Sequence, residues 1–212
     1  WDEALELARK CSEAQQRCGD VTGLAMSRYN AAEVLQDQGR FDRAEGMLVN
    51  ARRTWRAAGF SLGVAAATAS LGRIALRTGK DELAVALLDE AAASFGEFGA
   101  ESWVAEVDAH RVEADLFAGR WNDVLDATAQ DAVTEDASTQ DSGQDAALTS
   151  KLLRFRGVAL AAMQQPNAEK VLELAAEFAE QAHAPYELAL AKLELSGLPE
   201  RATTETARAA AV

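Results

Sequence analysis

Apolar residues recur at every third or fourth position through most of this 212-residue chain. Ala44, Met47 and Ala51 form one such row, and Ala84, Leu87 and Ala91 form another forty residues later. This spacing places the apolar side chains on one face of a helix. The pattern predicts helices over Asp2–Cys18, Val21–Gln38, Phe41–Ala58, Leu62–Thr78, Glu82–Phe98, Ser102–Ala118, Trp121–Gln130, Leu148–Met163, Ala168–Ala182 and Tyr186–Leu195.

Glycines follow the first six of these helices at intervals of twenty residues, at Gly19, Gly39, Gly59, Gly79, Gly99 and Gly119. Glycine adopts the left-handed conformation that closes a helix, so each one predicts a helix end. Two helices then form one forty-residue hairpin, and even spacing of this kind is typical of a repeat array. Asp20, Ser61 and Asp81 follow these turns and are predicted to cap the next helices.

The repeat divides the chain into four predicted segments. Residues 1–130 are regular hairpins that begin on the second helix of a hairpin, so we expect a fragment of a longer protein. Residues 131–147 are acidic, polar and without period, which predicts a loop insertion. Residues 148–195 predict a degenerate hairpin with one extra helix, and Pro199 marks residues 196–212 as a tail.

The order Leu71-Gly72, Ala75, Gly79, Ala84 resembles tetratricopeptide repeats, whose helix-turn-helix units are normally 34 residues long. The resemblance implies an all-α fold, a right-handed superhelical solenoid of antiparallel helical hairpins. Longer segments, such as 29–35 with 39–45, are similar to the extended repeats of multidomain bacterial signalling proteins. Those repeats follow a class III nucleotide cyclase domain or a signal-transduction ATPase domain; a repeat region beside a caspase-like protease would look much the same.

By this resemblance the chain is expected to be a non-catalytic protein-interaction or sensor module that binds a peptide or domain in its concave groove. The alternative is a structural spacer or self-association element that transmits autoinhibition in the parent protein. Other domains of that parent are further expected partners. The uncovered first helix also suggests a homodimer through that end.

Composition excludes several classes of partner. The 34 Asp and Glu residues outnumber 21 Lys and Arg, and the formal net charge of −13 disfavours nucleic acid. No apolar run reaches the 18 residues that suggest a membrane-spanning helix. A cytoplasmic location follows from the bacterial resemblance. Cys11 and Cys18 occupy the positions of Ala51 and Ala58, so they are expected to pack in the core.

No catalytic or metal-binding constellation emerges from the residue spacing. The only histidines are His110 and His183, interpreted as a groove residue and a turn residue. The acidic stretch around Asp141-Ser142-Gly143 lacks the alternating ligands and sixth-position glycine of an EF-hand. We therefore expect no enzyme activity, no metal and no cofactor.

The first helix of each hairpin lines the inner surface of such an array, where partners usually bind. Acidic residues dominate this surface, which disfavours acidic peptide tails and favours a partner with basic or mixed polar groups. The predicted partner-binding residues are Met26, Tyr29, Asn30, Glu33, Gln36, Ser70, Arg73, Leu76, Glu106, His110 and Glu113.

Overall fold

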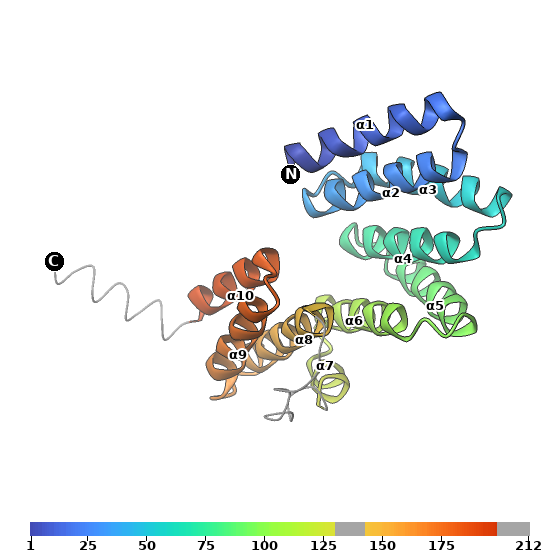
Figure 1. Cartoon of the computed structure of the whole chain (residues 1–212). Helices are drawn as coiled ribbons and strands as arrows, with labels where there is room; N and C mark the ends of the chain where they lie inside the picture. The colour runs from blue at the N-terminus through green and yellow to red at the C-terminus, as the bar shows by residue number, and fades with distance from the viewer. Residues whose placement is uncertain (130–142, 199–212) are drawn as a thin grey trace. The chain divides into compact units, whose positions relative to one another are not determined.

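The computed structural model describes residues 1–129 and 143–198, and within them every regular element is a helix (Figure 1). The all-α prediction is therefore confirmed. The helices are α1 (Asp2–Cys18), α2 (Val21–Asp37), α3 (Phe41–Ala57), α4 (Ser61–Arg77), α5 (Asp81–Glu97), α6 (Glu101–Phe117), α7 (Trp121–Ala127), α8 (Gly143–Ala162), α9 (Ala168–Gln181) and α10 (Pro185–Gly197).

The chain divides into two compact units, Trp1–Arg111 and the part from Val112 onward, so the boundary falls inside α6. The predicted boundary at residue 130 lies later in the chain. The predicted loop 131–147 ends too late, because α8 begins at Gly143; residues 131–142 lie outside the described residues. The predicted tail begins too early by two residues, since α10 continues to Gly197. Residues 199–212 also lie outside the description.

All six glycines of the twenty-residue series have left-handed backbone, with φ between 63° and 73°. At each turn the amide that follows the glycine donates to a carbonyl five residues earlier, as in Arg40 N to Leu35 O at 2.8 Å. This bond satisfies one of the carbonyls that a helix end leaves without a partner. The sequence prediction for these turns is confirmed.

The cap predictions are confirmed at one position of three. Asp20 accepts a hydrogen bond from Gly23 N at 2.8 Å through its side chain. Ser61 and Asp81 instead form the first residues of α4 and α5, after the cap residues Phe60 and Lys80, which make no side-chain cap bond. At Asp81 the carboxylate lies in the first turn, where the helix dipole favours negative charge.

In the first unit, consecutive helices from α1 to α5 pack against one another, and α2 also touches α4. Bulky side chains are enclosed between them: Trp55 of α3 and Phe95 of α5 are both 0% exposed. Small residues allow α4 to be buried on several sides, including Ala65, Ala66 and Ala67. The core of this unit is thus shared between successive hairpins.

The second unit has its own core. Val124 of α7 packs with Phe155 and Ala159 of α8, and Leu153 of α8 packs with Ala175 of α9 and Ala191 of α10. Gly157 lies where α8 crosses α9, and a Cβ there would come within 2.5 Å of Leu172 Cγ. The small residue is therefore required for the close approach of these two helices.

The prediction that Cys11 and Cys18 are core residues is wrong, because both thiols are exposed. The repeat equivalents of Cys11 are buried, with Ala51 1% and Ala91 0% exposed, whereas the position of Cys18 is also exposed in Ala58. The difference in burial between Cys11 and Ala51 follows from the helices packed around each of them. α3 lies between α2 and α4, whereas among the described residues α1 packs against α2 only.

Candidate functional site

A polar cluster joins α2 to α4 in the first unit, on the surface where the sequence predicts partner binding. We call it the α2–α4 seam. Its hydrogen bonds and ion pairs join residues 34 to 41 positions apart, so the repeat of about forty residues brings them together. The seam consists of Tyr29, Glu33, Gln36, Asp37, Ser70 and Arg73.

Arg73 is the cation of the seam. Its Nη1 lies 3.2 Å from Glu33 Oε2, and its Nη2 lies 3.4 Å from Asp37 Oδ1. The three side chains are between 26% and 31% exposed, so water reaches all of them. One guanidinium therefore serves two carboxylates, and these three residues together carry one net negative charge.

A second set of bonds lies deeper in the seam. Gln36 Nε2 donates to the backbone oxygen of Ser70 at 2.6 Å. The Ser70 hydroxyl donates to Tyr29 Oη at 3.2 Å. Gln36 is 6% exposed and Ser70 3%, so these groups tie α2 to α4 and are not surface groups.

Burial, followed by the nearby Glu33 carboxylate, raises the pKa of Tyr29 to about 12. Both effects disfavour the phenolate, since each makes a negative charge more costly. The Tyr29 ring also packs against Trp55 of α3, with ring centroids 5.5 Å apart. Tyr29 thus connects the seam to the apolar core, as an amphipathic side chain with one polar end does.

Two acceptors in the seam have no hydrogen-bond donor among the described residues: Glu33 Oε1 and Gln36 Oε1. Buried acceptors without a partner are uncommon and each has a cost in free energy. The deeper part of the seam therefore holds α2 and α4 together at a cost, while its exposed part carries the net negative charge of Glu33, Asp37 and Arg73.

The predicted site residues separate into three groups by exposure. Met26 is 38% exposed and Asn30 is also exposed. Tyr29, Glu33, Arg73 and Glu106 are half-buried. The remaining five are buried, so they support the surface residues and do not contact a partner directly: Gln36, Ser70, Leu76, His110 and Glu113.

Asp37 is the seam residue that sequence reasoning missed. It follows Met26, Asn30 and Glu33 in steps of three and four residues, so it continues their row on α2. That spacing could have identified Asp37 as a member of the predicted surface.

Glu113 belongs to the second unit and is not part of the seam as described. In the described ranges no three His, Cys, Asp or Glu side chains form a group that would hold a metal ion. Within the same ranges, no helix has the length and apolar character needed to cross a bilayer.

Residues 23–96 match the family model described as tetratricopeptide repeat. The match covers nearly all of α2 to α5 and therefore contains every residue of the α2–α4 seam. A search among curated proteins finds no match to the chain.

Tetratricopeptide repeats generally mediate protein–protein interaction, and their helical repeat fold is typically non-catalytic. The match therefore supports an interaction module and a protein partner.

Proposed function

We propose that the chain is a non-catalytic interaction module of a cytoplasmic bacterial signalling protein, and that it binds a basic peptide or domain along the row Met26, Asn30, Glu33 and Asp37. The observation that carries the proposal is the net negative charge of the water-accessible part of the seam. Glu33 and Asp37 share the single guanidinium of Arg73, and all three side chains are between 26% and 31% exposed.

The exposed part of the row gives the partner both apolar and polar contacts. Met26 offers a flexible thioether side chain, which adapts to irregular surfaces. Asn30 offers an amide four residues beyond Met26, and Glu33 offers a carboxylate three residues further along the same side of the helix. A lysine or arginine of the partner would place its N–H donors near Glu33, where Arg73 now supplies them.

Arg73 therefore competes with the partner for the same carboxylates. This competition gives a test in which the sign of the effect matters. Arg73→Gln removes the internal cation, so we expect tighter binding of a basic partner. Glu33→Gln removes one acceptor charge and should weaken binding severalfold.

The measurement is affinity capture with the wild-type chain as bait, followed by titration of the captured protein by calorimetry. The matched control is Glu97→Gln, which removes one exposed carboxylate at the end of α5. Weaker binding to Arg73→Gln than to the wild type would overturn the proposal, because an acidic partner would lose its cation.

A second candidate function is self-association, favoured by the exposed apolar side of α1. Leu7 is 55% exposed and Trp1 57%, and no residue of α1 is buried. Self-association would make the chain a structural element within its parent protein. Sedimentation velocity over a range of concentrations tests it, since a chain that stays monomeric throughout would exclude this function.

A further inference from the structure

A groove runs between α3 and α5 in the first unit and shares no residue with the α2–α4 seam. We call it the α3–α5 groove. Its floor is an apolar part of α4, where Leu71, Ile74 and Ala75 line the hollow and are at most 6% exposed. The hollow has a volume of about 140 Å³. Sites for whole small molecules usually hold about 300–1,000 Å³, whereas a cavity of about 150 Å³ accommodates one benzene molecule. The groove therefore has room for one large apolar side chain of a partner.

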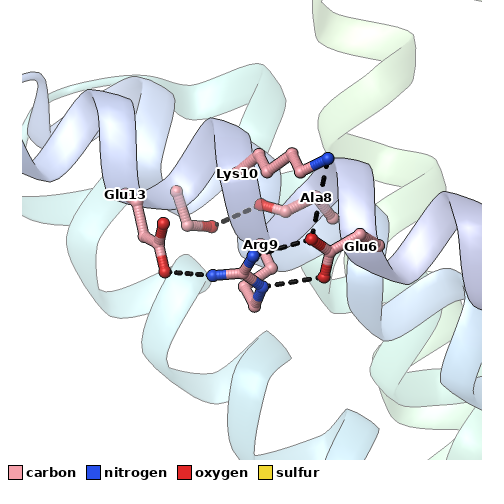
Figure 2. A network of polar contacts seen from close by, with 6 residues as sticks. Glu6, Ala8, Arg9, Lys10 and Glu13 are labelled. Atoms are coloured by element: carbon pink, nitrogen blue, oxygen red, sulfur yellow. Dashed lines mark hydrogen bonds and ion pairs between the residues drawn. The ribbon is translucent and has the colours of Figure 1, made fainter.

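The α3 wall of the groove carries an apolar side chain where the other repeats carry a charge. Val49 is 46% exposed and lines the hollow. Forty residues earlier its place is taken by Arg9, which pairs with Glu6 and Glu13 on the surface of α1 (Figure 2). Forty residues later it is taken by Asp89, which is also exposed. The repeat thus treats this place as a surface position, and packing between repeats does not account for a valine there.

The α5 wall shows the same change of residue type. Leu83 is 47% exposed and lines the hollow. Its repeat equivalents are Arg43 and Asp123, which are charged and exposed. Two exposed apolar side chains therefore flank an apolar floor at places where the other repeats have charges. Apolar side chains gathered around a hollow in this way are typical of an interaction site.

Ion pairs bridge the two walls at either end of the groove. Lys80 Nζ lies 3.9 Å from Glu45 Oε2, and Arg56 Nη2 lies 4.0 Å from Glu90 Oε1. The partners are thirty-five positions apart in the first pair and thirty-four in the second. A residue of α3 thus meets across the groove the residue of α5 that follows it by this separation.

Arg52 lies between these two pairs along α3 and lines the hollow. The same separation from Arg52 leads to Ala86 and Leu87, which carry no charge. In the part of the chain that the structure describes, Arg52 is half-buried and makes no hydrogen bond or ion pair. Its repeat equivalents are Ser12 and Ala92, so repeat packing does not require a cation at this place. Arg52 therefore offers its guanidinium to a group from outside the first unit.

We propose that the α3–α5 groove binds a peptide segment in which one large apolar side chain stands next to one carboxylate. The apolar side chain would lie on the floor of α4 between Val49 and Leu83, and the carboxylate would pair with Arg52. A guanidinium matches a carboxylate through two parallel N–H donors, and partial burial strengthens such a pair. The surface differs from the α2–α4 seam, so the proposal does not depend on the function proposed for the seam.

The charges around the hollow select among acidic groups. Arg52, Lys80 and Glu45 line it and together carry one net positive charge. A carboxylate neutralises that charge. A phosphate, with a charge of about −1.5 to −2, would leave negative charge beside Glu45. The groove therefore suits a glutamate or aspartate of the partner better than a phosphorylated residue.

A blocked peptide of glycine and serine with one phenylalanine followed by one glutamate serves as the probe. It is titrated into the full chain carrying carbon-13 methyl labels on isoleucine, leucine and valine. We expect the methyl resonances of Leu71, Ile74 and Leu83 to shift together, with a Kd of about 1 mM. Absence of these shifts at about ten times that concentration, or shifts confined to other parts of the chain, would overturn the proposal.

Two variants of the probe test its two contacts on the wild-type chain, so the outcome does not depend on the folding of a mutant. Alanine in place of the phenylalanine should abolish the methyl shifts, because the hollow then stays empty. Glutamine in place of the glutamate should weaken binding about fivefold. Equal binding of the glutamine and glutamate peptides would refute the role assigned to Arg52.

Variants of the chain test the same ion pair from the other side. Arg52→Gln should weaken the glutamate peptide about fivefold. The matched control is Arg53→Gln, because the neighbouring Arg53 donates to Asn50 Oδ1 at 3.1 Å and does not line the hollow. Arg52→Glu should reverse the preference, so that a peptide with lysine in place of the glutamate binds more tightly. Far-UV circular dichroism checks helicity, and equal losses for Arg52→Gln and Arg53→Gln would overturn the assignment.

Discussion

The helix turns of the two units reach the same backbone geometry with different residues. In the first unit the left-handed position is always glycine, as at Gly39 with φ 72°. In the second unit it is glycine at residue 119 but Gln164 after α8, with φ 54°, and His183 after α9, with φ 50°. The same hydrogen bond closes them, Gln165 N to Leu160 O and Ala184 N to Ala179 O, both at 2.9 Å.

This comparison shows that the hydrogen-bond pattern of the turn is preserved where its usual residue is lost. A side chain in left-handed backbone has a cost of about 1 kcal/mol from the clash of Cβ with the following carbonyl. In the second unit this cost applies at two positions, Gln164 and His183. Its turns are therefore recognisable in the structure but not from a glycine in the sequence.

The polar contacts between helices differ as well. In the second unit Arg154 Nε lies 3.4 Å from Glu187 Oε2, with side chains 9% and 13% exposed. Arg154 also lies 4.7 Å from the centroid of the Phe155 ring. The ion pairs of Arg73 in the α2–α4 seam are two to three times more exposed. The ion pairs of Arg73 thus lie near water, whereas the pair Arg154–Glu187 is enclosed.

The largest expected effect tests the difference in burial between these two ion-pair groups. Glu187→Leu would leave Arg154 buried without its carboxylate, and we expect a loss of about 3 kcal/mol in the stability of the second unit. Asp37→Leu in the seam should cost below about 1 kcal/mol, because Arg73 keeps Glu33 and water. Hydrogen exchange of amides in each unit measures both changes.

A control for the same comparison is Glu180→Leu, which removes an exposed partner of Lys192. We expect almost no change in stability there. Equal losses for Glu180→Leu and Glu187→Leu would contradict the role assigned to burial.

The next effect sharpens the description of the seam. Because the pKa of Tyr29 is raised to about 12, the folded chain holds this proton at pH values where the unfolded chain has lost it. The stabilisation by the neutral phenol is complete below about pH 10 and disappears as pH rises to about 12. The wild-type chain should therefore lose about 2 kcal/mol more than Tyr29→Phe over this range.

Urea unfolding at several pH values measures that difference. Phenolate absorbance in a Tyr186→Phe background isolates the titration of Tyr29, since the chain has only two tyrosines. Titration of Tyr29 near pH 10 would show that water reaches its hydroxyl far more than the burial of the side chain indicates.

The smallest effect concerns the turns. Gly39→Ala should destabilise the first unit by about 1 kcal/mol, because alanine enters left-handed backbone with strain. Gln164→Gly should stabilise the second unit by about 1 kcal/mol or less, since the relief of strain is partly offset by the greater entropy of unfolded glycine. Hydrogen exchange near each turn gives the sign. A destabilised Gln164→Gly variant would show that the Gln164 side chain contributes more than its strain costs.

Much of the helical architecture was predictable. Except at the start of α8, the three-and-four periodicity placed each described helix within three residues of its bounds, because a helix buries one face and its sequence must follow that face. The start of α8 was missed by five residues, since Gly143 and Gln144 carry no apolar signal. The turn at His183 was recognised, but its left-handed backbone was not.

All members of the seam except Asp37 were predicted to share one surface, but their contacts were not predicted. The repeat register placed Tyr29, Glu33 and Arg73 on one surface, as the structure shows. Register did not reveal that Arg73 is already engaged by two carboxylates, or that Gln36 is buried. Those facts depend on side-chain reach across two helices, which spacing along one helix does not specify.

The sequence by itself determined that this chain is a series of antiparallel helices closed at regular turns, because periodicity and glycine backbone preference act locally. Only the tertiary structure decided which of the equivalent positions are covered. Ala51 and Cys11 share a place in the repeat, yet one is enclosed and the other open. Burial depends on which elements lie nearby in space, and a residue's position in its own helix does not specify those elements.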